Sequence, residues 1–307
     1  GSAMFGKLLK PLNLTTNKPA SEVAIHLCSQ SVCLVAVSAE GTYRPKIETI
    51  TPQEGPEAMA RLLVDLKKGS RVHLVLSPEF YQLVQLDKPT LSDAELLQAL
   101  PWQVKDLVSI APEDMVADYT DVPGTTAQAA KINVVVASIS LLKPLVNAIT
   151  QAGLKLISIQ PEEWLAAYLQ PPQAHASLLV VQQPEQEILI QIIKDGVLYF
   201  SRRTRGFNRM QLGSDVQLQN DWLDRLQLEL QRSMDYFEGQ LKQAPVREVG
   251  LLMPNAQKLR ELLSSAGFSR VNTLAPALTQ NGCTETELLR CWPAIAVLNQ
   301  PAQDNAA

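Results

Sequence analysis

The stretch that decides the fold reads EVAIHLCSQSVCLVAVSAEGTYRPKIET over residues 22–49, and it returns as SLLVVQQPEQEILIQIIKDGVLYFSRRT over residues 177–204. The two stretches can be laid on each other without a gap, and this pairs Gly41 with Gly196. Each reads as an apolar strand, a short polar turn, a longer apolar strand, a turn ending in glycine and a third strand. Two copies of one three-strand unit in the two halves of a chain predict a tandem duplicated fold.

A helix and a further strand follow each of these blocks. After the first block, the apolar stripe of residues 57–68 predicts a helix and residues 71–76 predict a strand. After the second block, apolar residues recur at spacings of three and four through residues 221–241, which indicates a long amphipathic helix. Residues 249–253 then predict a strand. The order of three strands, a helix and a strand is half of a layered α/β domain.

Length and composition limit the class of protein. The 307 residues leave room for two domains of ordinary size, and a hydrophobic content of 46% supports packed cores. The formal net charge of -4 argues against a nucleic-acid binder, because neutralising phosphates needs an excess of Lys and Arg. We find no run of about eighteen apolar residues and no signal-peptide pattern, so we expect a cytoplasmic protein without a membrane span.

Four features, taken in order along the chain, carry a resemblance to a known family. They are the paired blocks, ALPWQVKDLV at residues 99–108, LQRSMDYFEGQ at residues 230–240, and the strand at residues 249–253. In this order they resemble the PilM-like family of type IV pilus assembly proteins, and within it the MshI proteins of the MSHA pilus system. The cytoplasmic domain of GspL is similar. The resemblance implies an α/β, actin-like (ribonuclease H-like) fold that is duplicated and two-lobed, with a small α/β subdomain inserted in the first lobe.

Domain boundaries follow from this fold and from the breaks in the sequence pattern. We place the hinge between the lobes at the Pro171-Pro172 pair, because adjacent prolines end regular structure. The expected parts are an expression scar (1–3), a flexible basic-apolar leader (4–20), the core of the first lobe (21–80), its inserted subdomain (81–160), a returning helix and hinge (161–172), the second lobe (173–299) and a disordered tail (300–307).

The resemblance also implies where a nucleotide would bind. In nucleotide-binding relatives the first turn of each block carries Asp and Gly, and the loop after the later strand is rich in glycine. The matching positions are His26 and Cys28 in the first turn, Gln182 and Gln183 in the second, and Pro254 in the later loop. Because Mg-ATP depends on backbone N–H donors and on carboxylates around the metal, we expect a degenerate site, no cofactor and no enzymatic activity. Weak binding of ATP stays open.

A metal site is the alternative interpretation of the first turn. His26 and Cys28 share a strand face, and Cys33 lies nearby in the sequence. The spacing matches no standard zinc pattern and a fourth ligand is missing. We therefore expect an ordinary core strand and no metal.

The partner expected from the resemblance is a PilN-like bitopic membrane protein. Its short N-terminal cytoplasmic peptide would lie in a groove of the first lobe, and the chain would thereby be peripheral to the inner membrane. Coupling to the pilus assembly ATPase is also implied. A short apolar peptide can be gripped by backbone pairing and apolar pockets, and we expect Trp102, Val104 and Leu107 to contact it. Trp102 could equally fill a packing interface.

Two further segments have alternative interpretations. Arg202, Arg203 and Arg205, with Arg209, form the densest basic cluster, which could bind an anion. A solvated strand end is the favoured interpretation. The leader at residues 4–20 interleaves lysine with leucine and could touch an anionic membrane or a partner, although a mobile terminus is favoured.

The leading hypothesis from the sequence is a non-enzymatic scaffold of type IV, MSHA-type pilus biogenesis. It would dock the PilN-like partner and couple it to the assembly ATPase. The rival hypothesis is an ATP-binding actin-like switch of the same machinery, in which nucleotide closes the cleft between the lobes and changes partner affinity.

Overall fold

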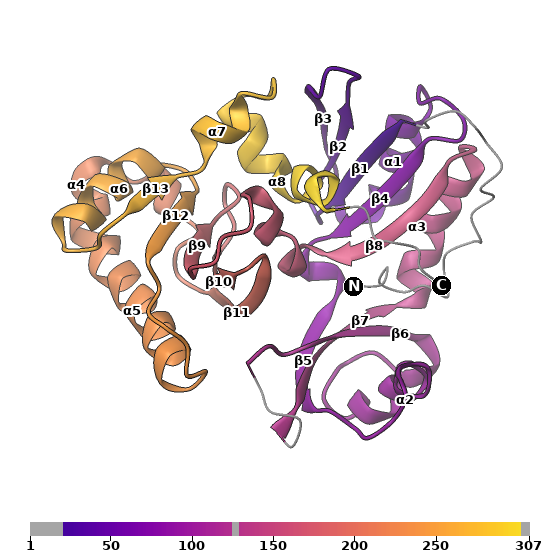
Figure 1. Cartoon of the computed structure of the whole chain (residues 1–307). Helices are drawn as coiled ribbons and strands as arrows, with labels where there is room; N and C mark the ends of the chain where they lie inside the picture. The colour runs from indigo at the N-terminus through magenta and orange to yellow at the C-terminus, as the bar shows by residue number, and fades with distance from the viewer. Residues whose placement is uncertain (1–20, 125–128, 302–307) are drawn as a thin grey trace. The chain divides into compact units, whose positions relative to one another are not determined.

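Two copies of one five-stranded sheet organise the chain (Figure 1). The computed structural model describes residues 21–124 and 129–301, so the predictions for residues 1–20 lie outside it. The strand order is β3-β2-β1-β4-β8 in the first sheet and β11-β10-β9-β12-β13 in the second. The repeated block therefore folds twice in the same way, as the sequence predicts.

The first sheet is built around β1, which pairs antiparallel with β2 and parallel with β4. Its third parallel strand, β8, pairs with β4, and β3 forms the other edge. The three strands predicted within residues 22–49 and the strand predicted at residues 71–76 are confirmed. The strands are β1 (Glu22–Leu27), β2 (Ser31–Val37), β3 (Tyr43–Thr49), β4 (Arg71–Leu76) and β8 (Lys155–Pro161).

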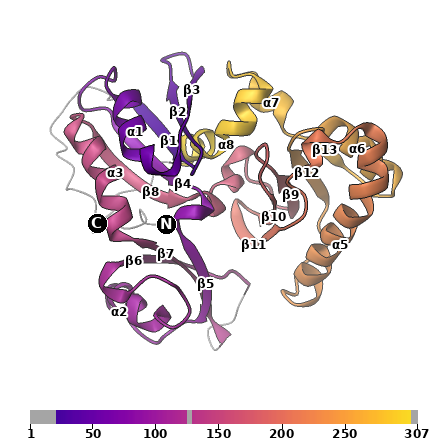
Figure 2. The same cartoon turned by 180° about the vertical axis from the view of Figure 1, so that it is seen from behind.

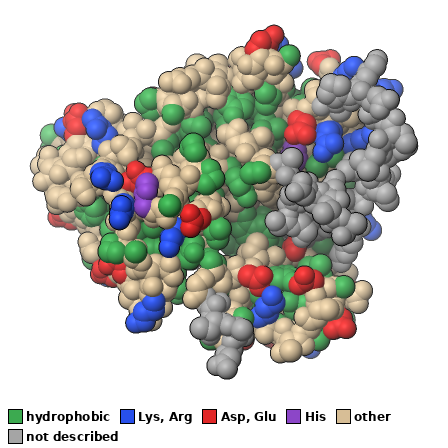
Figure 3. All heavy atoms as spheres, viewed as in Figure 1, with side chains coloured by type: hydrophobic (Ala, Val, Ile, Leu, Met, Phe, Trp, Pro, Cys, Tyr) green, Lys and Arg blue, Asp and Glu red, His purple; other side chains and the backbone are tan. Residues whose placement is uncertain are grey.

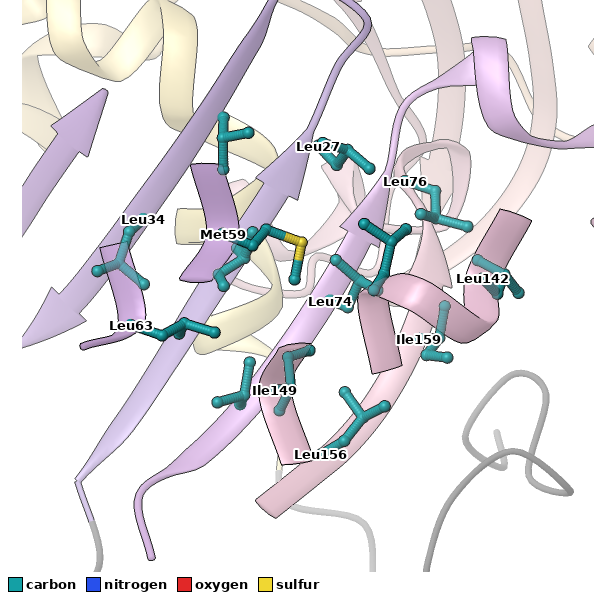
Figure 4. Packing of buried hydrophobic residues seen from close by; sticks show 14 of the residues in the cluster. Leu27, Leu34, Met59, Leu63, Leu74, Leu76, Leu142, Ile149, Leu156 and Ile159 are labelled. Atoms are coloured by element: carbon teal, nitrogen blue, oxygen red, sulfur yellow. The ribbon is translucent and has the colours of Figure 1, made fainter. Parts of the chain in front are cut away.

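The core of this half lies between one face of the sheet and the helices α1 (Gly55–Leu63) and α3 (Ile139–Gln151). Strand side chains alternate between faces, so Leu27, Leu74 and their neighbours on that face point at the helices. Figure 4 shows them facing Met59 of α1 and Ile149 of α3. The expected helix at residues 57–68 begins earlier and ends at Leu63.

The second sheet repeats the arrangement. Its outer strands β10 and β11 form the antiparallel hairpin, and β9, β12 and β13 run parallel. The strands are β9 (Ser177–Val181), β10 (Ile188–Lys194), β11 (Val197–Thr204), β12 (Glu248–Leu252) and β13 (Val271–Thr273). β12 confirms the strand predicted at residues 249–253.

Helices α5 (Leu223–Gly239) and α6 (Ala256–Ser265) pack against the second sheet. The long amphipathic helix is confirmed, because Leu226, Leu230 and Phe237 of α5 are fully buried in this core. Before α5 the chain forms a short helix and a π-helical turn that the sequence did not predict. The remaining helices are α4 (Asp215–Gln217), the π-helical turn (Leu218–Trp222), α7 (Ala275–Thr279) and α8 (Glu285–Asn299).

A three-stranded sheet with the order β5-β7-β6 forms the inserted subdomain. Helix α2 covers one face of it, and the Ser92 side chain caps this helix by accepting a hydrogen bond from Glu95 N. The elements are β5 (Gln82–Asp87), α2 (Asp93–Val104), β6 (Met115–Asp121) and β7 (Lys131–Ser138).

The predicted end of this insertion at residue 160 is wrong. Helix α3 packs in the core of the first sheet and β8 pairs with β4, so the insertion ends with β7 at Ser138. The helix predicted from residue 161 is also wrong. Two 3-10 turns, Glu162–Trp164 and Ala166–Leu169, take its place.

The chain divides into two compact units, residues 1–165 with 293–307 and residues 166–292 (Figures 1 and 2). The predicted hinge at residues 171–172 is therefore displaced, because Pro172 already packs beside Gly196 of the second unit. The end of α8 returns to the first unit, where Gln160 and Gln300 exchange side-chain hydrogen bonds. Gln300 thus belongs to the folded chain and not to a tail. In the described ranges no helix is long and apolar enough to cross a membrane.

The buried face of α2 gives a stability prediction. Leu100 is fully buried against the three-stranded sheet, whereas Leu97 on the same helix is partly exposed. We expect Leu100→Ala to lower the free energy of unfolding by about 2–5 kcal/mol, because it removes buried contacts and leaves a cavity. Leu97→Ala is the matched control and should cost about 0.5 kcal/mol. Urea denaturation followed by circular dichroism measures both, and equal costs would contradict this packing.

Candidate functional site

The positions expected to hold a nucleotide lie where parallel strands end. In open α/β sheets, ligands bind at the carboxyl ends of such strands. His26 is near the end of β1 and Cys28 follows it, while in the second unit Gln182 follows β9 and Pro254 comes just after β12. The fold therefore places each set at the carboxyl ends of the parallel strands in its own sheet.

A buried ion pair lies at the carboxyl ends of the parallel strands of the first sheet. His26 Nε2 lies 2.7 Å from Glu162 Oε2, and both side chains are almost completely buried. The Cys28 thiol lies 3.5 Å from the other ring nitrogen, His26 Nδ1. Glu162 directly follows β8, so the pair ties the end of β1 to the segment that leaves β8. The sequence pattern did not single out Glu162 as a site residue.

The surroundings of His26 favour its charged form. Burial by itself lowers the pKa of the imidazole, but the interactions with Cys28 and Glu162 outweigh burial and raise the pKa from 6.5 to about 10. The ring is therefore an imidazolium at neutral pH. A buried cation paired with a buried carboxylate leaves neither charge available to a ligand.

The neighbouring carboxylate is also bonded within the protein. Glu163 is buried, and its Oε1 accepts a hydrogen bond of 2.8 Å from the Tyr81 hydroxyl. Sequence reasoning missed both glutamates. The available signal was two carboxylates placed directly after a buried parallel strand, which is where polar site residues gather in this class of sheet.

A glutamine closes the corresponding turn in the second unit. Gln182 is buried, and its Nε2 donates hydrogen bonds of 2.8 Å to the carbonyls of Gln186 and Phe207. Its backbone N–H donates to Leu252 O of the neighbouring strand. Gln183 donates from Nε2 to Arg290 O at 3.3 Å. Both predicted positions are thus bonded to the unit that carries them.

The loop before α6 is held in a similar way. Asn255 adopts a left-handed backbone with φ of 60°, and its Nδ2 donates to the carbonyls of Met210 and Gln211 at 3.4 Å each. Pro254 beside it has no backbone N–H to offer a ligand. In a loop that binds a nucleoside, small residues with free N–H groups would be needed.

These contacts use the polar groups of the site to hold the protein together. The Cys28 N–H donates to Ser31 O across the first turn, so this donor is also used internally. The arrangement pairs its charged groups and many of its polar ones before any ligand arrives. Within residues 21–124 and 129–301 no cluster of three His, Cys, Asp or Glu side chains is arranged to hold a metal ion.

The three residues expected to contact a partner separate into two groups. Val104 is fully buried under α2, so the prediction that it contacts a partner is wrong. The reason is the helical period, which places Val104 on the same stripe as Leu96 and Leu100. Trp102 and Leu107 are exposed by 61% and 57%, respectively, and remain available at the surface.

The basic cluster does not converge on one point. Arg202 forms an ion pair with Glu229 of α5. Arg203, the next residue of the strand, has its side chain on the opposite face. Arg205 and Arg209 lie beyond the end of β11 and are exposed. The geometry agrees better with a charged strand end than with an anion site.

Comparison with known proteins supports the fold. No protein-family model and no curated protein sequence matches the chain. The structure is similar to a chain of the PilM-PilN type IV pilus biogenesis complex, with a TM-score of 0.64, 15% sequence identity, and coverage of 91% of this chain and 99% of that one. The chain therefore has this actin-like fold, with two α/β halves built on the same sheet order.

Two other solved structures are more distantly similar. One is the cytoplasmic domain of EpsL, an inner-membrane component of the type II secretion system of Vibrio cholerae, with a TM-score of 0.47, 13% identity, and coverage of 76% of this chain and 83% of that one. The other is a Bacteroides thetaiotaomicron protein with an actin-like ATPase fold, with a TM-score of 0.49, 10% identity, and coverage of 89% and 100%.

The raised pKa of His26 predicts a pH dependence of stability. The unfolded imidazole titrates near 6.5 and the folded one near 10. The stabilising charge is therefore fully present below pH 6.5 and is lost as the pH rises through 10. We expect the free energy of unfolding to fall across this window, measured by urea denaturation at pH 6, 8 and 9.5.

Variants isolate the contribution of the ion pair. His26→Gln should remove the decline above pH 6.5, and Glu162→Gln should cost about 3–5 kcal/mol at pH 6, because it leaves a buried cation without its partner. His175→Gln, at a half-buried histidine paired with Glu248, is the control that should keep the decline. A wild-type protein that is equally stable at pH 6 and pH 9.5 would contradict a charged His26.

Proposed function

We propose that this chain is a non-enzymatic scaffold of type IV pilus biogenesis, of the PilM-like, MshI type. It acts in the cytoplasm, at the inner membrane, and docks the N-terminal cytoplasmic peptide of a PilN-like membrane protein. The observation that carries this proposal is the likeness to the PilM-PilN structure, which extends over 91% of the chain. Coupling of this partner to the pilus assembly ATPase is part of the same proposal.

The internal bonding of the strand ends supports a scaffold over a nucleotide switch. The carboxylate nearest the first turn, Glu162, is paired with His26, and the second turn is closed by Gln182. A magnesium-bound nucleotide would have to displace these contacts before it could use the groups. We therefore propose that the chain transmits force or position through its partners and does not hydrolyse ATP.

The partner surface that we propose lies on α2 and the turn after it. Trp102 and Leu107 expose large apolar side chains there, and Leu97 of the same helix is partly exposed. Exposed aromatic and aliphatic residues that lie close together are typical anchor points of protein interfaces. Because Leu100 and Val104 fix α2 to its sheet, these side chains are presented on a rigid support.

Peptide binding tests this surface. A fluorescently labelled peptide with the N-terminal cytoplasmic sequence of the organism's PilN-like protein is titrated against the full chain and its variants. We expect Trp102→Ala and Leu107→Asp each to weaken binding by at least tenfold, because interface anchors contribute about 2 kcal/mol or more. Fluorescence anisotropy gives the dissociation constants.

Leu212→Asp is the matched control, because Leu212 is a leucine of the second unit that is even more exposed than Leu107. It should leave the affinity unchanged. If the wild-type chain fails to bind the peptide, the proposed function is contradicted. If the wild type binds the peptide and the Trp102→Ala and Leu107→Asp variants bind it equally well, the function stands and the proposed surface is wrong.

A further inference from the structure

The three-stranded sheet has a second face that is turned away from α2. Strand residues alternate between the two faces, and the register aligns Val84, Val134 and Tyr119 on the side that packs against α2. The adjacent row, formed by Leu83, Val135 and Asp118, lies on the opposite face.

Asp118 is an unusual residue on this face. It is only 5% exposed, and its single hydrogen bond within the described chain comes from the Tyr119 N–H, at 2.8 Å. No ion pair with it is present among the described residues. Burial is the largest influence on the pKa of Asp118 and raises it to about 6. A buried carboxylate is costly unless a cation or further donors satisfy it, so this position is suited to a positively charged group.

One end of this face packs in the core of the first sheet, through Val135, Ala137 and Val116, and its open part lies at β5. Leu83 is 43% exposed although it shares a row with the fully buried Val135. Its strand, β5, is an edge of the sheet and pairs with β7 without a register shift. It contains no proline, lysine or bulge, the devices that commonly protect edge strands. An extended segment with apolar side chains and one cation fits such a surface.

The charge of the subdomain points the same way. Residues 81–138 contain eight carboxylates and three lysines, a formal charge of -5, whereas the whole chain carries -4. Figure 3 shows Asp and Glu side chains beside hydrophobic ones on the visible part of this subdomain. By contrast, residues 4–20 contain three lysines and no acidic residue. Among them Phe5, Leu8, Leu9 and Leu12 alternate with Lys7 and Lys10.

We propose that residues 4–20 of this chain are the ligand of this second face. In this arrangement Lys7 or Lys10 pairs with Asp118, and the leucines beside them cover Leu83. The 17 residues of the leader can span up to roughly 56 Å, which is ample to reach a surface of the same unit. Because the leader is tethered to β1, its effective concentration at the face is on the order of millimolar. Any other basic-apolar peptide has to displace it.

A peptide added in trans tests the proposal with the full chain. The probe is a fluorescently labelled synthetic peptide with the sequence of residues 4–17. The tethered leader should exclude this peptide from the wild-type chain. In the variant K7E/K10E the leader no longer pairs with Asp118, so the face is vacated. We expect this variant to bind the probe at least tenfold more tightly than the wild type.

Two further variants, made in the K7E/K10E background, locate the contact. Asp118→Asn should weaken binding of the probe at least tenfold, because it removes the charge and keeps the shape. Asp121→Asn is the matched control, since Asp121 is an exposed residue of the same strand that pairs with Lys88, and it should leave binding unchanged. Hydrogen exchange of β5 gives a second measurement, and K7E/K10E should speed it relative to the wild type, whereas Lys18→Glu should not.

The outcomes decide between occupants. Equal binding of the probe by the wild type and K7E/K10E would show that the tethered leader does not occupy the face, and would overturn the proposal. Binding that survives Asp118→Asn would place the leader elsewhere and would also overturn it. If Asp118→Asn does not fold, the comparison of wild type with K7E/K10E, together with the exchange of β5, still gives the answer. These results do not depend on a PilN-like partner.

Discussion

The buried pair of His26 and Glu162 is the constraint on which the account of this molecule depends. Two opposite charges withdrawn from water stabilise the fold only while they remain together, so the end of β1 and the segment after β8 are committed to each other. In the second unit, the uncharged side-chain amide of Gln182 has a similar role, because it closes its turn by donating hydrogen bonds to two backbone carbonyls. The groups that stand where a nucleotide would lie in this fold are thus bonded to the protein itself.

The sheets could be predicted from the sequence, but several of the segments at their ends could not. Apolar alternation and the recurring glycine turn located the two blocks of repeated strands, because these are local signals. Glu162 and Glu163 could not be recognised from the sequence as buried residues, because their partners, His26 and Tyr81, are 136 and 82 residues away, respectively. The end of the insertion could not be predicted for a similar reason. Only the pairing of β8 with β4, which is distant in sequence, shows that the chain has returned to the first sheet. The burial of Val104 was predictable, because Leu96, Leu100 and Val104 form one stripe.

We propose that the inserted subdomain, and not the strand ends of the two sheets, binds partners, because the two regions differ in which polar groups already have hydrogen-bond or ion-pair partners. At the strand ends, His26, Glu162 and the side-chain N–H groups of Gln182 are bonded within the protein. The inserted subdomain instead exposes apolar side chains on α2 and in the turn after it, and its second face carries a buried carboxylate that no cation among the described residues pairs with. Recognition is therefore expected at the insertion and not at the strand ends. The acidic charge of the insertion favours basic-apolar segments, and the leader of the chain itself has this composition. A scaffold built in this way would respond to peptides and not to nucleotides.

Thermal unfolding of the full chain with and without Mg-ATP tests the central claim most directly. A ligand that binds only the folded state raises the melting temperature. At a concentration 100 times its dissociation constant, such a ligand adds about 2.7 kcal/mol to the free energy of unfolding. Because the phosphate-facing positions are bonded internally, we expect no shift at 5 mM Mg-ATP beyond that produced by 5 mM Mg-pyrophosphate or by the salt alone. A saturable shift of several degrees that is specific for the nucleotide would show that the site is functional, and would contradict the account.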